Sequence, residues 1–361
     1  MERRSSRSKS QHDIGGNHQE RGENVSAGRV PFLPLGSILR SAALIIAVVF
    51  LLCWSDENPA SRGNSLLGTN AGKVTAVAFS PNGRWLASAG FYSPVVIWDM
   101  THRQIDTILE KSPATTFSLA FSPDGANLAA ADIDGSVRIW NTELWSLAKI
   151  VQAHSLGVRS LAFSPDGKLL ATVGGDRTVR LWHTATWQPR RVLQLNDDTV
   201  RFVAFSPDAR KLAVAFRGGT VLIWDVEVEG SDFAIEPDLV NDGKAGNTTC
   251  LAFSPDGRAL VIPRVSEALA LRDSATGRIV SSLAETRSLV LSLSFSPDGR
   301  TLAAGTLSGT IELWDVAIGQ RKPDLRGHSA AVWALAFSPD GQSLVSGGRD
   351  GALRLWHMRP K

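Results

Sequence analysis

The chain has 361 residues, of which 43% are hydrophobic and 20% are charged, so it can bury a large core and is neither a disordered chain nor a disulfide-stapled miniature domain. Its 38 basic and 35 acidic residues leave a net charge of +3, which does not by itself indicate a nucleic-acid partner. Cys53 and Cys250 lie in different kinds of sequence, and we do not expect them to form a structural disulfide.

The beginning of the chain differs from the rest. Residues 1–29 are rich in Ser, Gly, Asn, Arg and Glu and lack aliphatic periodicity, which predicts a disordered polar and basic tail. Residues 30–54 contain a single charged side chain, that of Arg40. The apolar run at 38–54 predicts one transmembrane helix with Arg40 reaching toward the headgroups. Residues 55–64 are then a linker.

The charges on either side of this run predict its orientation. Seven Lys and Arg residues lie within residues 1–40, whereas Asp56 and Glu57 follow the run. This asymmetry places the N-terminus in the cytoplasm and the rest of the chain outside it. A cleaved signal peptide is disfavoured because about 40 residues precede the apolar run. A buried segment of a soluble cytoplasmic protein stays open as an alternative, since apolar runs this short are ambiguous.

One short motif recurs seven times in residues 65–361. Phe-Ser-Pro-Asp-Gly or a close variant begins at Phe79, Phe121, Phe163, Phe205, Phe253, Phe295 and Phe337. The spacing is 42 residues, apart from 48 between the fourth and fifth copies. Nineteen residues after each Phe stands a Trp, except in the fifth repeat, which has Arg272. A period of this length indicates a solenoid, a propeller or a repeat array.

The segments around the motif favour strands over helices. VRSLAF and TVRLWH are typical of them, and they are short and rich in Val, Leu and Trp. Ser-Pro-Asp-Gly is a tight-turn sequence, because Pro presets φ, Asp bonds back to the backbone and Gly accepts a positive φ. Each motif therefore predicts a hairpin. Ala209 replaces the Gly in the fourth copy, at a cost of about 1 kcal/mol if the turn needs a left-handed residue.

The chain from residue 62 onward resembles the WD-repeat β-propeller family. The name-giving Trp-Asp pair occurs three times and the Gly-His signature once, at Trp98-Asp99, Trp224-Asp225, Trp314-Asp315 and Gly327-His328. The resemblance implies an all-β fold, a seven-bladed β-propeller of four-stranded antiparallel blades over residues 65–361.

The resemblance also implies a buried tetrad of His, Ser or Thr, Asp and Trp. The third and seventh repeats have all four members, which are His154, Thr172, Asp176 and Trp182, and His328, Ser346, Asp350 and Trp356. A Ser-His-Asp group resembles a catalytic triad, but the Trp partner favours a structural network. The fifth repeat departs most from the pattern, with Ile262, Ser266 and Arg272 in place of Thr, Asp and Trp. We expect this blade to be the least well determined.

Closure of the ring is a separate prediction. The sequence ends shortly after Trp356, so the seventh blade has only three strands from its own repeat. Residues Ser65 to Thr69 precede the first blade at the place where an outer strand precedes the later blades. We expect them to supply the fourth strand of the seventh blade, which removes an open sheet edge.

The resemblance places two sets of side chains on the top face of the ring, four residues before each motif Phe and seven before each repeat Trp. Two groups are candidates for partner binding. The first comprises Trp333, Arg349, Phe91, Tyr92 and Phe117, and the second comprises Arg159, Arg201 and Arg217. Aromatic and Arg side chains are enriched at binding hot spots, although partly buried packing residues are the structural alternative. An acidic insertion at 227–248 is either a partner arm or, as we favour, a solvated loop.

Motifs of enzyme and cofactor sites are missing from the sequence, which has no HExxH, GxSxG, GxxxxGK or CxxC. We therefore predict no cofactor and no metal. The resemblance implies a non-enzymatic interaction scaffold that binds other proteins. The apolar run at 38–54 adds a membrane anchor, and the small net charge gives no reason to expect nucleic acid. One alternative is an extracytoplasmic propeller enzyme of the lactonase or hydrolase type, which needs convergent carboxylates or a metal. Another is a TolB-like periplasmic module, whose repeats lack the Gly-His and Trp-Asp pairs.

Overall fold

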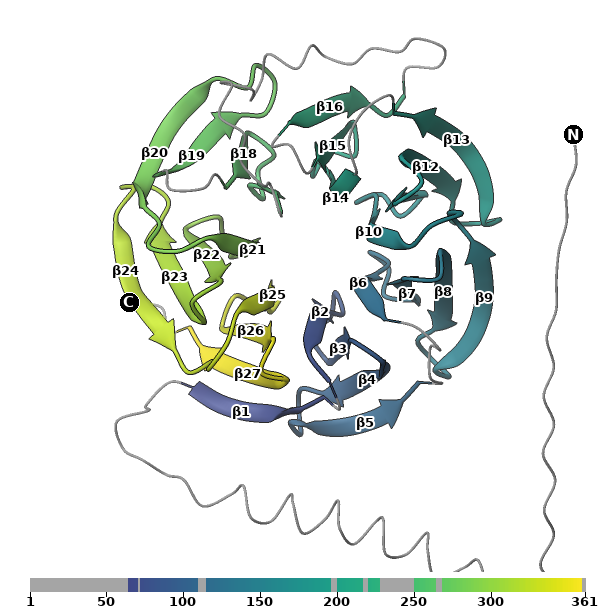
Figure 1. Ribbon diagram of the computed structural model, residues 1–361, viewed down its shortest axis with the longest axis horizontal. Coiled ribbons are helices and arrows are strands. Elements are labelled where there is room, and N and C mark those ends of the chain that lie inside the picture. Colours follow the sequence, from purple (N-terminus) through teal and green to yellow (C-terminus); the bar gives the residue numbers. More distant parts are fainter. Residues whose placement is uncertain are drawn as a thin grey trace, which may run out of the picture. The chain divides into compact units, whose positions relative to one another are not determined.

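Each repeat folds into a small antiparallel sheet because tight turns join its short strands. The structure is a computed structural model that describes residues 64–358, except 71, 110–114, 196–199, 217–219, 228–249 and 264–267. Seven sheets stand around a central axis, and in each of them the strand that ends at the motif Phe is innermost (Figure 1). The all-β seven-bladed propeller predicted from the repeats is confirmed.

The first three blades have four strands each, in chain order from the centre outward. Blade one contains β2 (Val74–Phe79), β3 (Trp85–Gly90), β4 (Ser93–Asp99) and β5 (Gln104–Ile108). Blade two contains β6 (Thr116–Phe121), β7 (Asn127–Asp132), β8 (Ser136–Asn141) and β9 (Ser146–Gln152). Blade three contains β10 (Val158–Phe163), β11 (Leu169–Gly174), β12 (Thr178–His183) and β13 (Gln188–Gln194).

The next three blades follow the same plan with local differences. Blade four contains β14 (Val200–Phe205), β15 (Lys211–Phe216) and β16 (Val221–Asp225), which are its strands among the described residues. Blade five contains β17 (Ala252–Phe253), β18 (Ala259–Ile262), β19 (Ala268–Asp273) and β20 (Ile279–Glu285). Blade six contains β21 (Val290–Phe295), β22 (Thr301–Thr306), β23 (Thr310–Asp315) and β24 (Arg321–Arg326). The two inner strands of blade five are the shortest of their kind, which agrees with the weak repeat pattern there.

Blade seven is completed by a strand from the start of the ring. It contains β25 (Val332–Phe337), β26 (Ser343–Gly348), β27 (Ala352–His357) and, outermost, β1 (Asn64–Thr69). β1 runs antiparallel to β27, with Ser65 opposite Leu355 and Thr69 opposite Ala352. The predicted closure through residues 65–69 is confirmed, and Figure 1 shows the first and last strands side by side.

The Ser-Pro-Asp-Gly turns have the geometry that their sequence predicts. In blade three, the Gly167 amide donates to the Ser164 carbonyl at 2.8 Å, and the Ser164 hydroxyl donates to the Asp166 carboxylate at 2.6 Å. Gly167 has a φ of 73°. Ala209 occupies the same position in blade four with a φ of 61°, so this turn does place an alanine in the left-handed region, which is strained for a residue with a Cβ.

The core lies between neighbouring blades. Strands β11 and β12 of blade three, for example, pack Val173 and Leu181 against Val200 and Phe216 of blade four. At the junction of blades seven and one, Leu67 of β1 packs in the same cluster as Trp98. Apolar side chains on both faces of inner strands such as β11 are therefore buried, which explains why these strands show little polar alternation, whereas outer strands such as β9 are mostly exposed.

The N-terminal predictions lie outside the described residues. These are the tail at 1–29, the transmembrane run at 38–54 and most of the linker at 55–64. Within the part of the chain that the structure describes, we found no helix long and apolar enough to cross a bilayer. The insertion at 227–248 also lies outside the described residues, apart from Glu227.

Candidate functional site

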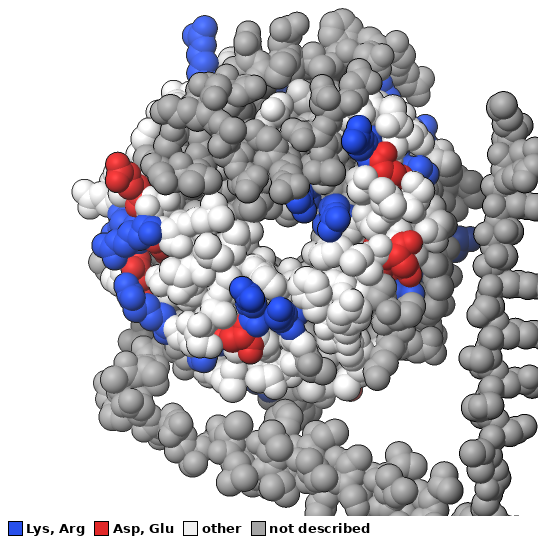
Figure 2. All heavy atoms as spheres, viewed as in Figure 1, with Lys and Arg blue, Asp and Glu red and all other residues white. Residues whose placement is uncertain are grey.

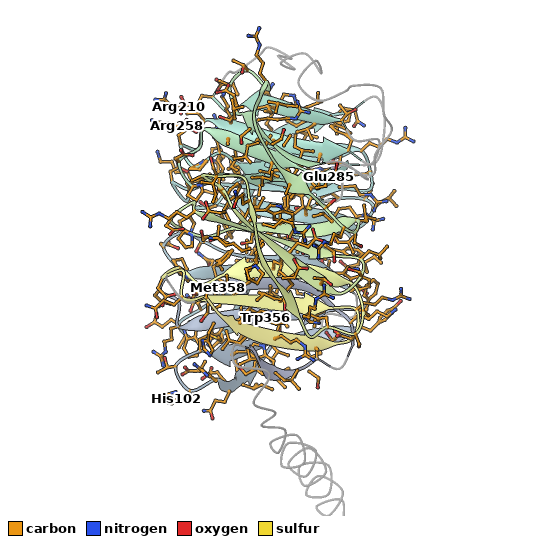
Figure 3. All side chains as sticks on the ribbon, turned by 90° about the vertical axis from the view of Figure 1, so that its left-hand side faces the viewer. His102, Arg210, Arg258, Glu285, Trp356 and Met358 are labelled. Carbon is orange, nitrogen blue, oxygen red and sulfur yellow. The ribbon has the colours of Figure 1, made fainter. Side chains whose placement is uncertain are left out.

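The two faces of the ring carry different connections. The Ser-Pro-Asp-Gly turns and the turns into the outer strands share one face, where Figure 3 labels Arg210, Arg258 and His102. The opposite face, marked by Glu285 at the end of β20, carries the turns between second and third strands and the loops between blades. We call this second face the top face. It is turned toward the viewer in Figures 1 and 2.

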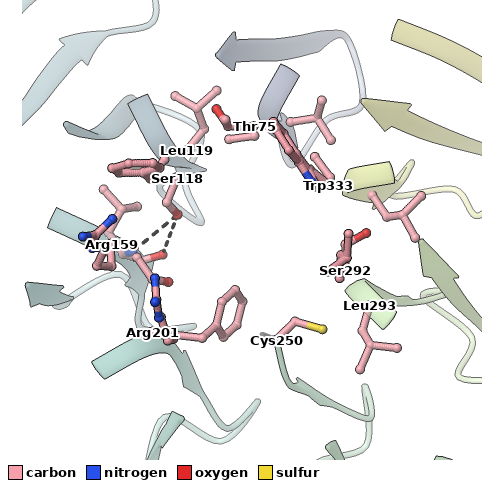
Figure 4. Close-up of a pocket in the computed structure, with 18 of the residues that line it drawn as sticks. Thr75, Ser118, Leu119, Arg159, Arg201, Cys250, Ser292, Leu293 and Trp333 are labelled. Atoms are coloured by element: carbon pink, nitrogen blue, oxygen red, sulfur yellow. Dashed lines mark hydrogen bonds between the residues drawn. The ribbon is translucent and has the colours of Figure 1, made fainter. Parts of the chain in front are cut away.

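A cavity of about 610 Å³ lies on the central axis (Figure 4). Its wall is formed mainly by the innermost strands of the blades, which surround the axis. Five of the eight side chains predicted for partner binding line it, namely Phe91, Phe117, Arg159, Arg201 and Trp333. The repeat register therefore brings residues from five blades to one opening.

Three of these residues form a continuous aromatic surface. The ring of Phe91 lies 5.7 Å from that of Trp333 and 6.2 Å from that of Phe117, measured between ring centroids. All three side chains are half-buried, so each presents part of its ring at the cavity. The Lys73 ammonium lies 5.8 Å from the centre of the Phe91 ring. Separations and angles of this kind are favourable for aromatic pairs and cation–π contacts.

Two arginines border the cavity on the neighbouring inner strands β10 and β14. The Arg159 guanidinium lies over the Phe117 ring, 5.1 Å from its centre. Figure 4 shows Arg159 and Arg201 on the same side of the channel, away from Trp333. Among the described residues that line the cavity, none is Asp or Glu. In Figure 2, basic side chains and no acidic ones border the central opening among the residues described there.

The remaining predicted binding residues are not part of the cavity wall. Tyr92 is 81% exposed and has a φ of 51° at the tip of the turn between β3 and β4. Arg349 is exposed in the corresponding turn of blade seven. Arg217 lies outside the described residues. The first predicted group thus separates into a half-buried aromatic cluster at the channel and two exposed side chains on turns farther out.

The sequence analysis missed the row of residues that forms the wall below the rim. This row stands three residues before each motif Phe, and its cavity-lining members are Ala76, Ser118, Ser160, Phe202, Cys250, Ser292 and Ala334. Reading that position across the repeats would have found it. The Ser118 hydroxyl is 3.5 Å from the Leu161 carbonyl and 3.4 Å from the Leu161 amide (Figure 4). Its hydrogen bonds therefore join blade two to blade three.

The tetrad of blade three is a connected hydrogen-bond network. Trp182 Nε1 donates to Thr172 Oγ1 at 3.0 Å, and His154 joins Thr172 Oγ1 through Nε2 and Asp176 Oδ1 through Nδ1, both at 2.9 Å. Asp176 also accepts the Ser155 amide at 3.1 Å. The network therefore ties the loop before the blade to its second and third strands.

Blade seven repeats this arrangement. Trp356 Nε1 donates to Ser346 Oγ at 2.8 Å, His328 Nε2 lies 2.7 Å from the same oxygen, and His328 Nδ1 lies 3.0 Å from Asp350. Asp350 accepts the Ser329 amide at 2.9 Å. Every polar group of the His side chain is thus engaged, and the hydroxyl oxygen serves two neighbours. Neither Thr172 nor Ser346 lines the central cavity.

Burial and hydrogen bonding together shift the pKa values of the His and Asp side chains in these networks. Burial lowers the pKa of His154 and His328, although the adjacent Asp carboxylates act in the opposite direction. Burial acts to raise the pKa of Asp176 and Asp350, but their hydrogen bonds outweigh it, so both pKa values lie below the usual value. Neutral imidazoles paired with ionised carboxylates are a stable structural arrangement.

The described part of the chain contains no cluster of metal-binding side chains. Within it, no three His, Cys, Asp or Glu side chains gather closely enough to hold a metal ion. The hydroxyls of Ser118, Ser160 and Ser292 at the channel contact backbone atoms of the next blade at 3.4 to 3.5 Å. The chemistry that the channel offers is thus an aromatic surface beside two guanidinium groups.

Comparisons with known proteins agree with the architecture. Residues 115–361 match the family model described as IFT122 first beta-propeller. Residues 63–101 match the family model described as WD domain, G-beta repeat. No curated protein matches the chain.

Proposed function

The chain belongs to the family of the IFT122 first beta-propeller and has the WD-repeat fold, and from this premise we propose that it is a non-enzymatic platform that binds another protein on its top face. WD-repeat propellers typically mediate protein–protein interactions. The fold alone hosts many functions, so the residues of the face must support the proposal.

The observation that carries it is the aromatic cluster of Phe91, Phe117 and Trp333 beside Arg159 at the mouth of the channel. Trp, Tyr and Arg side chains are enriched among the residues that dominate binding energy at protein interfaces, and aromatic rings bury a large apolar area. The enzyme alternative needs converging carboxylates or a metal, and the described lining of the channel has no carboxylate.

Photo-crosslinking tests the proposal. A photoreactive amino acid replaces Tyr92, which is exposed on the top face, in the full-length chain, and a matched control carries it at Arg258 on the opposite face. We expect a defined protein adduct from position 92 and none from position 258. Trp333→Ala should remove the adduct without lowering the melting temperature. Equal adducts from both faces, or an adduct that survives Trp333→Ala, would contradict the proposal.

We further propose that residues 38–54 anchor the platform in a membrane, with the propeller on the extracytoplasmic side. The support is the apolar run, in which Arg40 is the single charged residue, and the basic residues that precede it. The full-length chain should stay with membranes after an alkaline carbonate wash, and protease applied from the extracytoplasmic side should reach the propeller. Release of the chain by carbonate would contradict the membrane anchor. Protection of the propeller from the protease would contradict the proposed orientation.

A further inference from the structure

We propose that the rim formed by blades seven, one and two lies on the lipid surface of the membrane, so that the ring stands edge-on and its top face stays open to a partner. This inference rests on the proposed function, because it uses the anchor at residues 38–54. The contact surface consists of the apolar side chains that β1, β5 and β9 expose, which we call the apolar arc. Its members are Leu66, Ile108, Leu147 and Ile150.

The first argument is the composition of the arc. Its four side chains are between 40% and 57% exposed, and the three strands that carry them follow one another around the rim (Figure 1). The charged residues of these strands are Asp106 and Lys149. By contrast, β24 has the sequence RKPDLR and β13 the sequence QPRRVLQ. Charges and proline protect those two edges, whereas the arc offers apolar area to a neighbour.

The second argument is the place where the chain enters the ring. β1 begins at Asn64 in the outermost position of blade seven, and residues 55–63 separate it from the apolar run that ends at Trp54. A fully extended chain of this length spans about 35 Å, whereas a compact domain of about 300 residues is roughly 50 Å across. If the far rim of blades three to five touched the bilayer, β1 would lie beyond the reach of its tether.

Lipid contact through either flat face is less favourable than contact through this rim. The top face toward the membrane would cover the aromatic cluster that the proposed function assigns to a partner. The opposite face carries exposed charged side chains of both signs at its motif turns, among them Asp166, Lys168 and Arg258. Such charges favour water, whereas exposed Leu and Ile side chains gain free energy at the boundary between headgroups and acyl chains.

The backbone of the outer strands limits how deep the contact can be. β5 and β9 are the outermost strands of their sheets, so part of their N–H and C=O groups point outward without a partner strand. Open sheet edges do not occur in the hydrocarbon region, because nothing there satisfies these groups. The side chains of the arc therefore reach into the headgroup region while the strands themselves stay hydrated.

Quenching of fluorescence by lipids tests the orientation. The full-length chain is reconstituted in phosphatidylcholine vesicles that contain a lipid with a nitroxide at its headgroup, and a fluorescent amino acid replaces Ile150. Matched control positions are Val280, which is 62% exposed in β20 on the far side of the ring, and Arg258 on the face of the motif turns. We expect quenching at position 150 and no more than the background of nitroxide-free vesicles at positions 280 and 258.

Matched substitutions separate the apolar contact from the tether. With the reporter at position 150, the double variant Ile108→Asp, Leu147→Asp should lose the quenching, because ionised carboxylates keep the arc in water. It should still stay with membranes after a carbonate wash. The control pair Val192→Asp, Val280→Asp changes exposed residues of other outer strands and should leave the quenching unchanged. If the first pair lowers the melting temperature, Ile108→Ser, Leu147→Ser takes its place.

The outcomes distinguish this inference from the proposed function. Quenching at position 258 and not at 150, or equal quenching at 150 and 280, overturns the edge-on orientation and leaves the anchor in place. A photo-crosslink from position 150 to a second copy of the chain also overturns it, because protein and not lipid then covers the arc. If carbonate releases the chain, the anchor and this inference are both wrong, and crosslinking from Tyr92 still decides whether the top face binds a partner.

Discussion

The Asp350 carboxylate joins the buried imidazole of His328 to the exposed loop before β25. It lies 3.0 Å from His328 Nδ1 and accepts the Ser329 amide at 2.9 Å, and His328 is in turn bonded to Ser346. A carboxylate in this position fixes the orientation of the imidazole and the path of the loop before β25. Removing it leaves the buried His328 Nδ1 without this partner, and the desolvation of that group is then uncompensated.

We therefore predict that Asp350→Ala lowers the free energy of unfolding by about 1 to 3 kcal/mol, measured by urea denaturation. Asp134 is the matched control, because it stands at the same repeat position in blade two. Its carboxylate accepts the amide and hydroxyl of Ser136 and lies 3.8 Å from Arg138, without a histidine partner among these contacts. Asp134→Ala should lower the free energy of unfolding clearly less than Asp350→Ala does. Equal losses from the two variants would show that the His-centred network adds nothing to stability.

The buried imidazoles predict a dependence of stability on pH. The pKa values of His154 and His328 are lowered from 6.5 in the folded protein, so the unfolded chain binds protons more readily than the folded one as pH falls below that value. Stability from these groups is therefore complete above about pH 7 and decreases as the pH falls toward the lowered folded values. The Asp partners contribute a further loss only below their usual value of 3.8.

A double substitution tests whether His154 and His328 cause this pH dependence. Blade one has Asn70 at the His position, where its Oδ1 accepts the Ser88 hydroxyl at 3.2 Å, so Asn fits this place in the fold. The double variant His154→Asn, His328→Asn should have a lower melting temperature at about pH 7.5 but a smaller further decrease between about pH 7 and pH 5. If the decrease in that interval is as steep as in the parent chain, other groups cause it.

At the scale of the elements, β1 is the strand on which closure depends. Leu67 is 8% exposed and packs with Trp98 and Leu355, whereas its neighbour Leu66 is 44% exposed. Gly68 also matters, because a Cβ there would lie 2.4 Å from the Trp98 ring. β1 is thus inserted between blades seven and one and is more than a cover for the edge of β27.

We predict that Leu67→Asp lowers the free energy of unfolding by about 3 to 5 kcal/mol, because it buries an unpaired carboxylate in an apolar cluster. It should also increase aggregation on size-exclusion chromatography, since loosening β1 exposes the edge of β27. Leu66→Asp, one residue away on the exposed side, should change stability by less than about 1 kcal/mol. Similar effects of the two substitutions would contradict the register of β1.

The elements also show which features the repeat pattern could predict. The turns, the strand order and the channel-facing positions repeat every blade, so their spacing in the sequence reveals them. Blade six was not predictable in this way. Ala304 stands at the tetrad hydroxyl position, and Trp314 Nε1 donates instead to the Ala284 carbonyl at 3.0 Å. Glu312, which is 1% exposed, pairs with Arg321 at 3.3 Å.

Blade two also contains polar contacts that the other blades do not share. Asp132 is fully buried, accepts the Thr116 hydroxyl at 2.6 Å and forms an ion pair with Arg138. These contacts depend on residues that occur together in one blade, so no periodic signal marks them. The candidate site likewise combines features that could be predicted from the sequence with features that could not. The resemblance to WD-repeat propellers predicted that Phe91, Phe117 and Trp333 share the top face, but their mutual contacts depend on side-chain orientation.

At the scale of the whole molecule, the ring joins residues from distant parts of the chain into one face. Phe91 and Trp333 are in contact across the junction of blades seven and one, which exists because β1 closes the ring there. The aromatic cluster therefore depends on the closure, and a change that opens the ring should also weaken partner binding.

Hydrogen exchange of the full-length chain, with and without the protein identified by crosslinking, is the most direct measurement of where the ring binds. The account predicts that backbone amides around Phe91, Phe117, Arg201 and Trp333 become protected in the complex, while the Ser-Pro-Asp-Gly turns on the opposite face exchange as before. Protection confined to those turns or to the outer strands, with unchanged exchange at the mouth of the channel, would contradict it.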